Sequence, residues 1–368
     1  MSRIVRTVSD RTLAGGTCHR LSREVNAAVL VYGAYGHTGR FVVAELTRRG
    51  LIPILSGRDA LALERLGRRF PDSQVRVAAV DDTASLEAAA RGVAAVLNCA
   101  GPFVDTAPPV AAAAVHAGAH YLDITAEQAA VRQLYRAHEE LRWRTDVAVL
   151  PAMAFFGGLA DLLVSAAVAG WDAVDEITIA IGLDRWWPTE GTRTTGRRNT
   201  APRLVVRDGR LVPVTGPAPS RDWHFPGPLG RQEVARAPFA EIVTVARHVR
   251  ASSVQTYLAT TALDDVRDPT TPAPQAVDDT GRSAQRFTVD VVARRGQRTH
   301  RVAASGRDIY AVTAPLLVEA TERLLDGRAE SAGAVAPGEA FDALDFLTAL
   351  TPDHLAVEGA SSGRNAPG

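Results

Sequence analysis

The stretch Ala28-Val-Leu-Val-Tyr-Gly33-Ala-Tyr-Gly36-His-Thr-Gly39-Arg-Phe-Val-Val43 places an apolar strand, a glycine turn and an amphipathic helix in direct succession. We expect Gly33 to permit a tight turn, Gly36 to let the backbone approach a pyrophosphate, and Gly39 to allow close packing of helix on strand. The helix N-terminus would present unpaired N–H groups to the same anion. At the head of a βαβ unit, this order favours a dinucleotide-binding turn over a purely structural one.

The pattern after this turn extends the same fold to about residue 155. Short β-rich runs alternate with Ala-, Leu- and Arg-containing segments of helical period, which is typical of a parallel sheet with crossover helices. Strands are expected near Ala27–Tyr32, Ile52–Ser56, Val75–Val80, Ala95–Cys99, His120–Ile124 and Val147–Leu150. Helices are expected near Thr38–Arg49, Ala60–Phe70, Ser85–Arg91, Pro108–Ala117 and Glu127–Arg144. The predicted fold class of residues 27–155 is therefore α/β, a Rossmann-type doubly wound parallel sheet.

The sequence after Pro151 predicts a second, α+β domain built on a mostly antiparallel sheet. A passage rich in Gly, Arg, Thr and Pro runs from Asp184 to Arg231, and such long excursions between strands are typical of a sheet separate from the first domain. The expected elements are a helix near Leu159–Ala169 and strands near Glu176–Leu183, Glu241–Ala246, Val254–Thr260 and Phe287–Ala293. We expect residues 156–305 to form this substrate and dimerisation domain.

The two ends of the chain have different patterns. Helical patterns near Asp308–Asp326 and Phe341–Leu350 lead us to expect that residues 306–350 pack back on the first domain. Residues 1–26 lack the apolar stretch of a signal peptide and are expected to be a disordered extension. Residues 351–368 are expected to form a frayed tail.

Composition restricts the partners and mechanisms. Of 368 residues, 46% are hydrophobic and 22% charged, as in a globular protein. The 41 basic residues balance 41 acidic ones, which disfavours nucleic acid and anionic membranes as partners. Every basic residue is arginine. Without lysine the chain has no Schiff base, no Walker A clamp and no Tyr-x-x-x-Lys pair.

Cysteine usage and hydropathy indicate a cytoplasmic location. The only cysteines, Cys18 and Cys99, form no disulfide framework. No apolar run approaches the ~18–20 residues that span a bilayer, so we expect no membrane partner. The expected partners are a small-molecule substrate and a second copy of the chain in a homodimer.

The end of the second expected strand, Ile52-Pro-Ile-Leu-Ser-Gly-Arg58-Asp59, decides which dinucleotide is bound. A carboxylate there would bind the ribose hydroxyls of NAD, whereas an arginine would pair with the 2′-phosphate of NADP. Asp59 is well placed to cap the helix that begins at Ala60, so Arg58 favours NADP(H). Asp81, after the third strand, could border the adenine or cap the next helix.

The loop Gly101-Pro102-Phe103 follows the fourth strand, where loops of a doubly wound sheet close over the nicotinamide. A rigid strand-to-helix turn is the alternative interpretation. The full set of expected cofactor contacts is Gly33, Tyr35, Gly36, His37, Thr38, Gly39, Arg40, Ser56, Gly57, Arg58, Asp81, Cys99, Ala100, Gly101, Pro102 and Phe103.

With these residues in place, the first domain resembles the saccharopine dehydrogenase-like family, which includes saccharopine reductases and trans-acting enoyl reductases. The matching segments are Gly33–Arg40, Leu55–Asp59, Val96–Phe103, Gly118–Glu127, Gly306–Ala314 and Gly333–Pro337. The resemblance implies an NADP-binding domain, a mostly antiparallel second domain, and hydride transfer to a C=N or polarised C=C bond in the cleft between them.

The chain departs from the family pattern in two places. Ala154-Phe155-Phe156 replaces a Gly-Phe-Asp or Gly-Leu-Asp of many relatives, and Ala126-Glu127 replaces Gly-Glu. The missing carboxylate at Phe156 puts inheritance of a relative's substrate in doubt.

Three polar residues at and after the fifth strand are candidates for catalysis: Tyr121, Asp123 and Glu127. The carboxyl end of that strand would aim them at the cofactor crevice, and hydride addition needs a proton donor or an electrostatic partner for the developing charge. Helix capping by Asp123 or Glu127 is an equally open interpretation.

Other chemistry-bearing residues have weaker patterns. His116 and His120 have the i,i+4 spacing of a helical metal pair, but Gly118 is expected to end the helix between them, so no metal is expected. In the second domain, a substrate pocket or a solvated loop could be formed by Trp186-Trp187-Pro188, Arg193, Arg197, Arg198 and Tyr257.

The sequence leaves two hypotheses about function. The leading hypothesis is an NADPH-dependent reductase of a small metabolite that could carry a carboxylate. The alternative is a sensor or scaffold protein that keeps NADP binding but has lost catalysis.

Overall fold

The strands expected in the first domain form one parallel sheet in a computed structural model that describes residues 27–141, 146–216, 219–330 and 333–359. Within these ranges the sheet has seven strands in the order β15-β6-β5-β4-β1-β2-β3. The strands are β1 (Ala28–Tyr32), β2 (Ile52–Gly57), β3 (Gln74–Val77), β4 (Ala95–Asn98), β5 (His120–Asp123), β6 (Ala148–Leu150) and β15 (Gly333–Ala334). All its pairings are parallel, so the predicted doubly wound sheet is confirmed.

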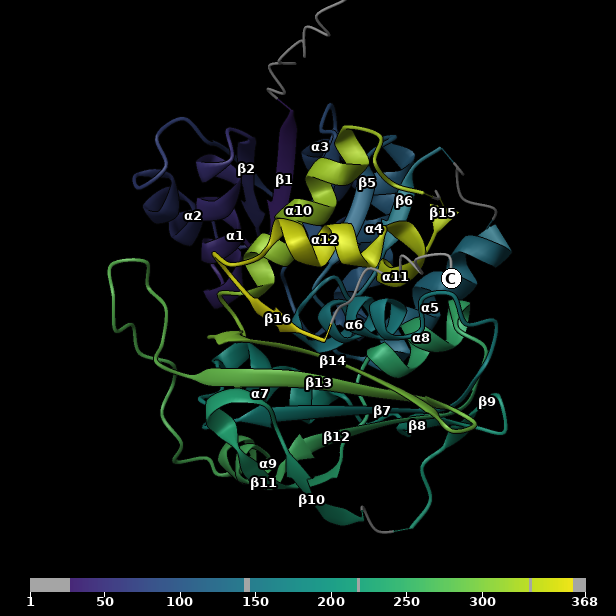
Figure 1. The fold of residues 1–368 in the computed structure, drawn as a ribbon. Helices are drawn as coiled ribbons and strands as arrows, with labels where there is room; N and C mark the ends of the chain where they lie inside the picture. The colour runs from purple at the N-terminus through teal and green to yellow at the C-terminus, as the bar shows by residue number, and fades with distance from the viewer. Residues whose placement is uncertain (1–26, 142–145, 217–218, 331–332, 360–368) are drawn as a thin grey trace, which may run out of the picture.

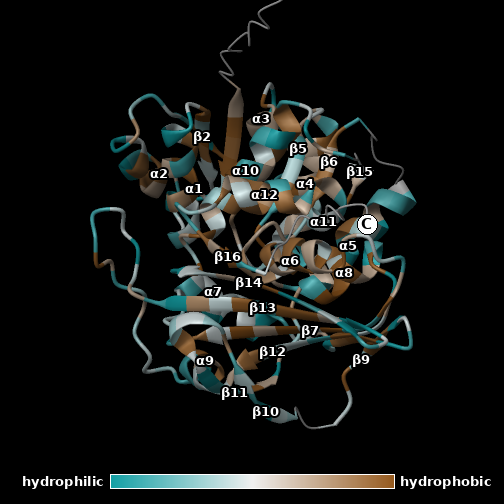
Figure 2. Ribbon diagram, viewed as in Figure 1, coloured by the Kyte–Doolittle hydropathy of each residue, from teal (hydrophilic) through white to brown (hydrophobic). Residues whose placement is uncertain are grey.

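Helices cover both faces of this sheet because its central strands are apolar on both sides. Along β1, Val29 and Val31 join one buried cluster and Leu30 and Tyr32 join the other, as a strand's alternation requires. The first face carries α1 (His37–Arg48), α2 (Ala60–Gly67) and α10 (Thr313–Leu325), and the second carries α3 (Thr83–Ala90), α4 (Phe103–His116) and α5 (Gln128–Leu141). Figure 2 shows hydrophobic colour along β1 and on the helices between the sheets.

One helix begins earlier than the sequence predicts. The expected start at Pro108 is wrong, because α4 begins at Phe103 and contains Pro108 and Pro109 in its interior. Proline favours helix starts, but a residue distant in sequence stabilises the first turn of α4. The Glu127 side chain accepts the Phe103 N–H at 2.8 Å.

The second sheet is mostly antiparallel, as expected, with the main order β10-β11-β12-β7-β13-β14-β16 among the described residues; β8 pairs with β12, and β9 pairs with β8. Only β12 and β7 pair in parallel within it. The strands are β7 (Val174–Leu183), β8 (Leu204–Arg207), β9 (Arg210–Pro213), β10 (Ser220–His224), β11 (Arg231–Arg236), β12 (Ala251–Ala259), β13 (Arg286–Arg295), β14 (Arg298–Arg307) and β16 (Ala356–Glu358).

The strand expected at Glu241–Ala246 is wrong, because Glu241–His248 forms the helix α8. Its β-branched run, Ile242, Val243 and Val245, is buried between two core clusters, and α8 packs against α5, α6 and η1. Tertiary packing therefore overrides the local β propensity. The sequence also gave no signal for α7 (Glu190–Arg198) or α9 (Thr260–Arg267), which interrupt the long excursions of this sheet.

The C-terminal segment joins both layers. Helix α10 packs on α1, and Arg49 at the end of α1 pairs with Glu319 of α10 at 2.6 Å. Residues 356–358 form β16, which pairs with β14, so the frayed tail expected from residue 351 is wrong for this stretch. Residues 360–368, the extension 1–26 and the expected end of the fifth helix at Arg144 lie outside the described ranges.

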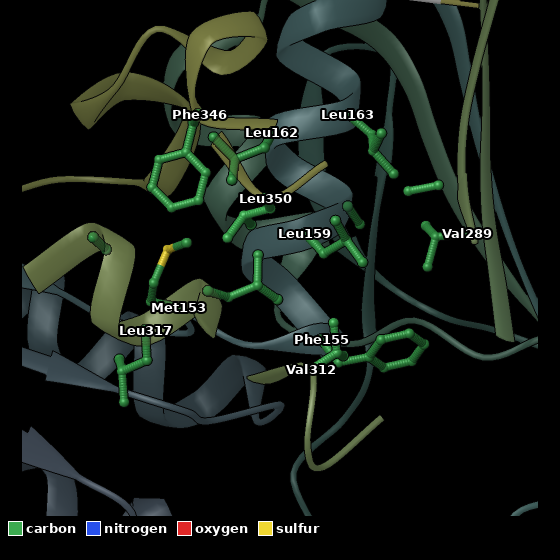
Figure 3. Close-up of a cluster of buried hydrophobic side chains, with 14 of the residues drawn as sticks. Met153, Phe155, Leu159, Leu162, Leu163, Val289, Val312, Leu317, Phe346 and Leu350 are labelled. Atoms are coloured by element: carbon green, nitrogen blue, oxygen red, sulfur yellow. The ribbon is translucent and has the colours of Figure 1, made fainter. Parts of the chain in front are cut away.

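A shared core fixes the two sheets relative to each other. The helices α6 (Ala160–Ala167) and α12 (Ala343–Ala349) lie between the sheets in Figure 1, and the kinked segment η1 (Phe155–Leu159) packs against α6. Their side chains meet residues of α10 and β13 in the cluster drawn in Figure 3, where Phe155 points towards the second sheet. The rings of Phe155 and Phe287 are 4.8 Å apart. This core sets the geometry of the cleft between the two domains.

Candidate functional site

A cavity of about 1380 Å³ lies at the carboxyl ends of the first sheet's strands and is closed by the second domain. One part is lined by the glycine turn and the 101–103 loop, and another by α7, α9 and the segment before α8. Ligand pockets usually measure about 300–1,000 Å³. The volume is therefore large enough for a dinucleotide portion and a second small ligand.

The glycine turn has the shape that a pyrophosphate requires. Gly33 has a φ of +81°, and its N–H donates to the Ser56 carbonyl at 2.8 Å. A Cβ on Gly39 would lie 2.3 Å from the Gly33 oxygen, so the turn packs directly on α1. A Cβ on Gly36 would contact only that oxygen, at 3.1 Å. The open space beside Gly36, at the N-terminus of α1, fits an anionic dinucleotide.

Most of the expected cofactor contacts line the cavity. They are Gly33, Tyr35, Gly36, His37, Thr38, Arg40, Gly57, Arg58, Cys99, Ala100, Gly101, Pro102 and Phe103. Gly39 lies beneath the turn, and Ser56 is fully buried. Asp81 does not line the cavity and does not cap α3, since Asp82 accepts the Ser85 N–H instead.

Asp59 and Arg58 have different surroundings, as the sequence suggests. The Asp59 side chain accepts the Ala62 N–H at 2.9 Å and caps α2. Arg58 is exposed and lines the cavity. The guanidinium is thus available for a phosphate at the end of β2, whereas the neighbouring carboxylate has a structural partner.

Tyr121 and Asp123 lie beneath the cavity rather than on its surface. Both are fully buried, and neither belongs to the lining. The Tyr121 hydroxyl donates to Asp123 Oδ2 at 2.9 Å, and Asp123 Oδ1 accepts the N–H groups of Thr125 and Ala152 at 3.0 and 2.8 Å. This network holds the ends of β5 and β6 together, which suits residues that position others.

The same network predicts a pH-dependent stability. Burial raises the pKa of Asp123 from 3.8 to about 6, so the folded state holds this proton more tightly than the unfolded state. The stabilisation is complete below the unfolded pKa and is lost as pH rises through about 6, a change of about 3 kcal/mol. Urea unfolding across this window should show a smaller decrease in the free energy of unfolding for Asp123→Asn than for the wild type. Equal pH dependence in both proteins would contradict the assignment.

Glu127 is the one of the three catalytic candidates that reaches the cavity. Its Oε1 accepts the Phe103 N–H, while Oε2 is buried and makes no hydrogen bond in the described part of the chain. Burial raises the pKa of this carboxyl group. The N–H groups at the start of α4 act in the opposite direction but do not outweigh burial. A buried carboxyl group with one uncommitted oxygen is suited to holding a proton.

Aromatic side chains line the cavity around Phe156. The Phe156 ring lies 4.3 Å from that of Phe239 and 5.3 Å from that of Trp186, between ring centroids. We call Phe156, Trp186 and Phe239 the aromatic wall. Of the other second-domain candidates, Arg198 lines the cavity but pairs with Asp105 at 2.9 Å. Trp187, Pro188, Arg193, Arg197 and Tyr257 do not line it.

Sequence reasoning missed several lining residues, including Arg203, Thr195 and Tyr310. The Tyr310 ring lies 5.2 Å from that of His37, and its hydroxyl receives the Trp186 Nε1–H at 3.0 Å. Tyr310 therefore links the glycine turn to the aromatic wall. Its signal was the Gly306–Ala314 segment, which matched the family pattern without indicating a role.

His116 and His120 lie on different elements, as Gly118 between them suggests. His116 is exposed at the end of α4, and His120 Nδ1 accepts the Ala148 N–H at 3.0 Å. Within the described ranges, no group of three or more His, Cys, Asp or Glu side chains could hold a metal ion. No helix in the same ranges is long and apolar enough to cross a membrane.

Comparison with known proteins assigns the first domain. The family model described as the saccharopine dehydrogenase NADP binding domain matches residues 29–149. Residues 29–149 are a saccharopine dehydrogenase-type NADP-binding domain. The resemblance noted in the sequence and the predicted NADP-binding domain are thereby confirmed.

Relatives of this NADP-binding domain extend the comparison. A saccharopine dehydrogenase-like oxidoreductase of Bos taurus is 28% identical over 53% of this chain and 52% of its own. A lipid droplet localized protein of Caenorhabditis elegans is 31% identical over 36% of this chain and 35% of its own. The chain thus spans about half the length of the bovine relative, or less in the case of the worm protein.

A solved structure shows that the fold extends beyond the NADP-binding domain. Saccharopine dehydrogenase (L-Glu forming) from Saccharomyces cerevisiae aligns with a TM-score of 0.60 at 12% identity, over 90% of this chain and 99% of that one. This likeness confirms the two-layer fold class. The cytoplasmic location and the homodimer remain predictions.

Proposed function

We propose that the chain is an NADPH-dependent reductase that transfers a hydride to a C=N or polarised C=C bond of a small metabolite. The observation that carries this proposal is the shared cavity, in which the glycine turn and Arg58 meet Glu127 and the aromatic wall. A protein that only binds the cofactor would need the glycine turn and Arg58, but not Glu127 or the aromatic wall. Bound NADPH would supply the hydride, so the chain's own groups must orient the acceptor and provide a proton.

Glu127 is the residue we assign to the proton. Its Oε1 is fixed by the Phe103 N–H, and Oε2 is free of other hydrogen bonds within the described residues. A proton held on Oε2 would pass to the acceptor as the hydride arrives, which completes a two-electron reduction and leaves a carboxylate at the start of α4. Tyr121 and Asp123 support this segment from below as positioning residues.

Arg58 is expected to select NADPH over NADH. Because charge-assisted hydrogen bonds contribute about 1.5–3 kcal/mol, Arg58→Ala should weaken NADPH binding by about 10- to 100-fold. NADH has no 2′-phosphate, so its affinity should change little. Fluorescence titration with both cofactors measures the two effects.

The matched control is Asp59→Ala, because Asp59 caps α2 without lining the cavity. This variant should lose about 1 kcal/mol of stability and keep the cofactor preference. If NADH affinity falls as far as NADPH affinity in Arg58→Ala, the guanidinium does not bind the 2′-phosphate.

The proposed reduction is tested by the loss of NADPH absorbance with two promiscuous acceptors, the cyclic imine dihydroisoquinoline and the enal cinnamaldehyde. We expect turnover of at least one of them by the wild type and none above background in a protein that cannot bind NADPH. Tight NADPH binding without turnover of either acceptor would favour the sensor or scaffold alternative, to which Phe156 in place of a carboxylate gives some support.

A further inference from the structure

Arg203 is a partly buried guanidinium that lines the cavity and has no acidic partner in contact. It precedes β8 and forms no salt bridge among the described residues. Its Nη1 donates at 3.0 Å to the side-chain oxygen of Asn199, in the amide orientation that satisfies both groups. The arginines of α7 have partners, since Arg198 pairs with Asp105 at 2.9 Å, Arg197 pairs with Glu190 at 3.1 Å and Arg193 donates to the Thr271 carbonyl at 2.8 Å. A cation withdrawn from water usually has an anionic partner.

The amide of Gln128 places Arg203 beside the aromatic wall. Its Nε2 donates to the carbonyls of Leu204 and Phe239, both at 2.9 Å, and its Oε1 accepts the Leu204 N–H at 2.7 Å. One buried side chain therefore holds the residue after Arg203 and the backbone of Phe239 together. A ligand with an apolar body on the wall and a polar end at Arg203 would lie within this one cavity.

The charges around Arg203 restrict the anion. Glu127 and Glu241 are fully buried, interact electrostatically with Arg203, and each has an Oε2 without a hydrogen bond in the described ranges. Burial lowers the pKa of Arg203, whereas these two carboxyl groups oppose that effect. One guanidinium matches the single charge of a carboxylate, whereas a doubly charged phosphate would bring a second negative charge that Arg203 alone does not balance.

We propose that Arg203 anchors the carboxylate of a monoanionic substrate whose aromatic or alicyclic body lies on Phe156 and Phe239. This names the substrate class of the proposed reductase and therefore rests on that function. It differs from a polar, multiply charged substrate, for which the aromatic wall offers no partners.

Binding of an unreactive probe tests the anchor without requiring turnover. Hydrocinnamate and its neutral amide, titrated calorimetrically into protein saturated with NADP⁺, differ in charge at almost constant shape. We expect the acid to bind the wild type more tightly than the amide, and phenyl phosphate to bind more weakly than the acid. Arg203→Gln should lower the affinity for the acid about 10- to 100-fold and leave that for the amide nearly unchanged.

Three further variants separate charge from packing. Arg203→Lys should retain part of the affinity for the acid, because a cation remains. Phe156→Ala should weaken binding of acid and amide alike. Arg197→Gln, on α7 but outside the lining, should leave both unchanged.

Two results with the probes would overturn the anchor: no saturable binding of hydrocinnamate to the wild type, or an equal loss of affinity for acid and amide in Arg203→Gln. Failure of the reductase proposal is distinguishable, because probe binding would then persist while neither imine nor enal consumes NADPH. Loss of NADP⁺ binding in Arg203→Gln would also contradict the proposal, since it would place the guanidinium at the cofactor.

Discussion

Gly36→Val is expected to abolish saturable NADPH binding while leaving the fold intact. The backbone at Gly36 has φ −64° and ψ 167°, a conformation that any residue adopts. A Cβ there meets only the Gly33 oxygen at 3.1 Å, so the turn should need no more than a small adjustment. The valine methyl groups would instead fill the space in which the backbone approaches the pyrophosphate. Circular dichroism and fluorescence titration measure fold and binding on the same sample.

Two other glycines provide matched controls. Gly67→Ala at the end of α2 should be tolerated with full NADPH affinity, since its Cβ would lie 3.6 Å from Val75. Gly39→Ala should lose both stability and binding, because its Cβ would lie 2.3 Å from the backbone oxygen of Gly33. A folded Gly36→Val protein that binds NADPH as the wild type does would move the pyrophosphate away from this turn.

The parts of the site that could be predicted from sequence are those encoded locally. The turn from Gly33 to Gly39 is specified by its own glycines, and Asp59 caps the helix that begins at the next residue by accepting the N–H of Ala62, three residues on. The continuous apolar run of β1 predicted a buried strand, and both of its faces are indeed buried. These features depend on contacts between near neighbours in the chain.

Long-range contacts explain what sequence reasoning missed. Arg203 owes its position to Gln128, which lies 76 residues from Leu204 in sequence. The start of α4 depends on Glu127, and the helical state of Glu241–His248 depends on packing against η1 and α5. Tyr121 and Asp123 sit at the expected strand end, but alternation along β5 turns them into a buried network. No local pattern contains this information.

Glu127→Gln is expected to have the second large effect, because Glu127 lines the cavity whereas Tyr121 and Asp123 lie beneath it. Glutamine keeps an oxygen for the Phe103 N–H, so α4 should retain its start and NADPH affinity should stay nearly unchanged. Turnover of the imine or enal should fall about 10²- to 10⁴-fold, as expected when a positioned proton donor is removed. Asp105→Asn is the control, because the Asp105 carboxylate also lines the cavity but is exposed and paired with Arg198. Turnover by this variant should change only a few-fold.

The pH profile distinguishes proton donation by Glu127 from a packing effect. Burial raises the pKa of Glu127, so the protonated form persists to higher pH than in an ordinary glutamic acid. Wild-type kcat should therefore decrease as pH rises through this raised pKa, because the donor is then ionised. The residual activity of Glu127→Gln should lack that decrease, since glutamine does not titrate. Turnover near the wild-type level in Glu127→Gln, or the same pH-dependent decrease in both proteins, would assign the proton to another group.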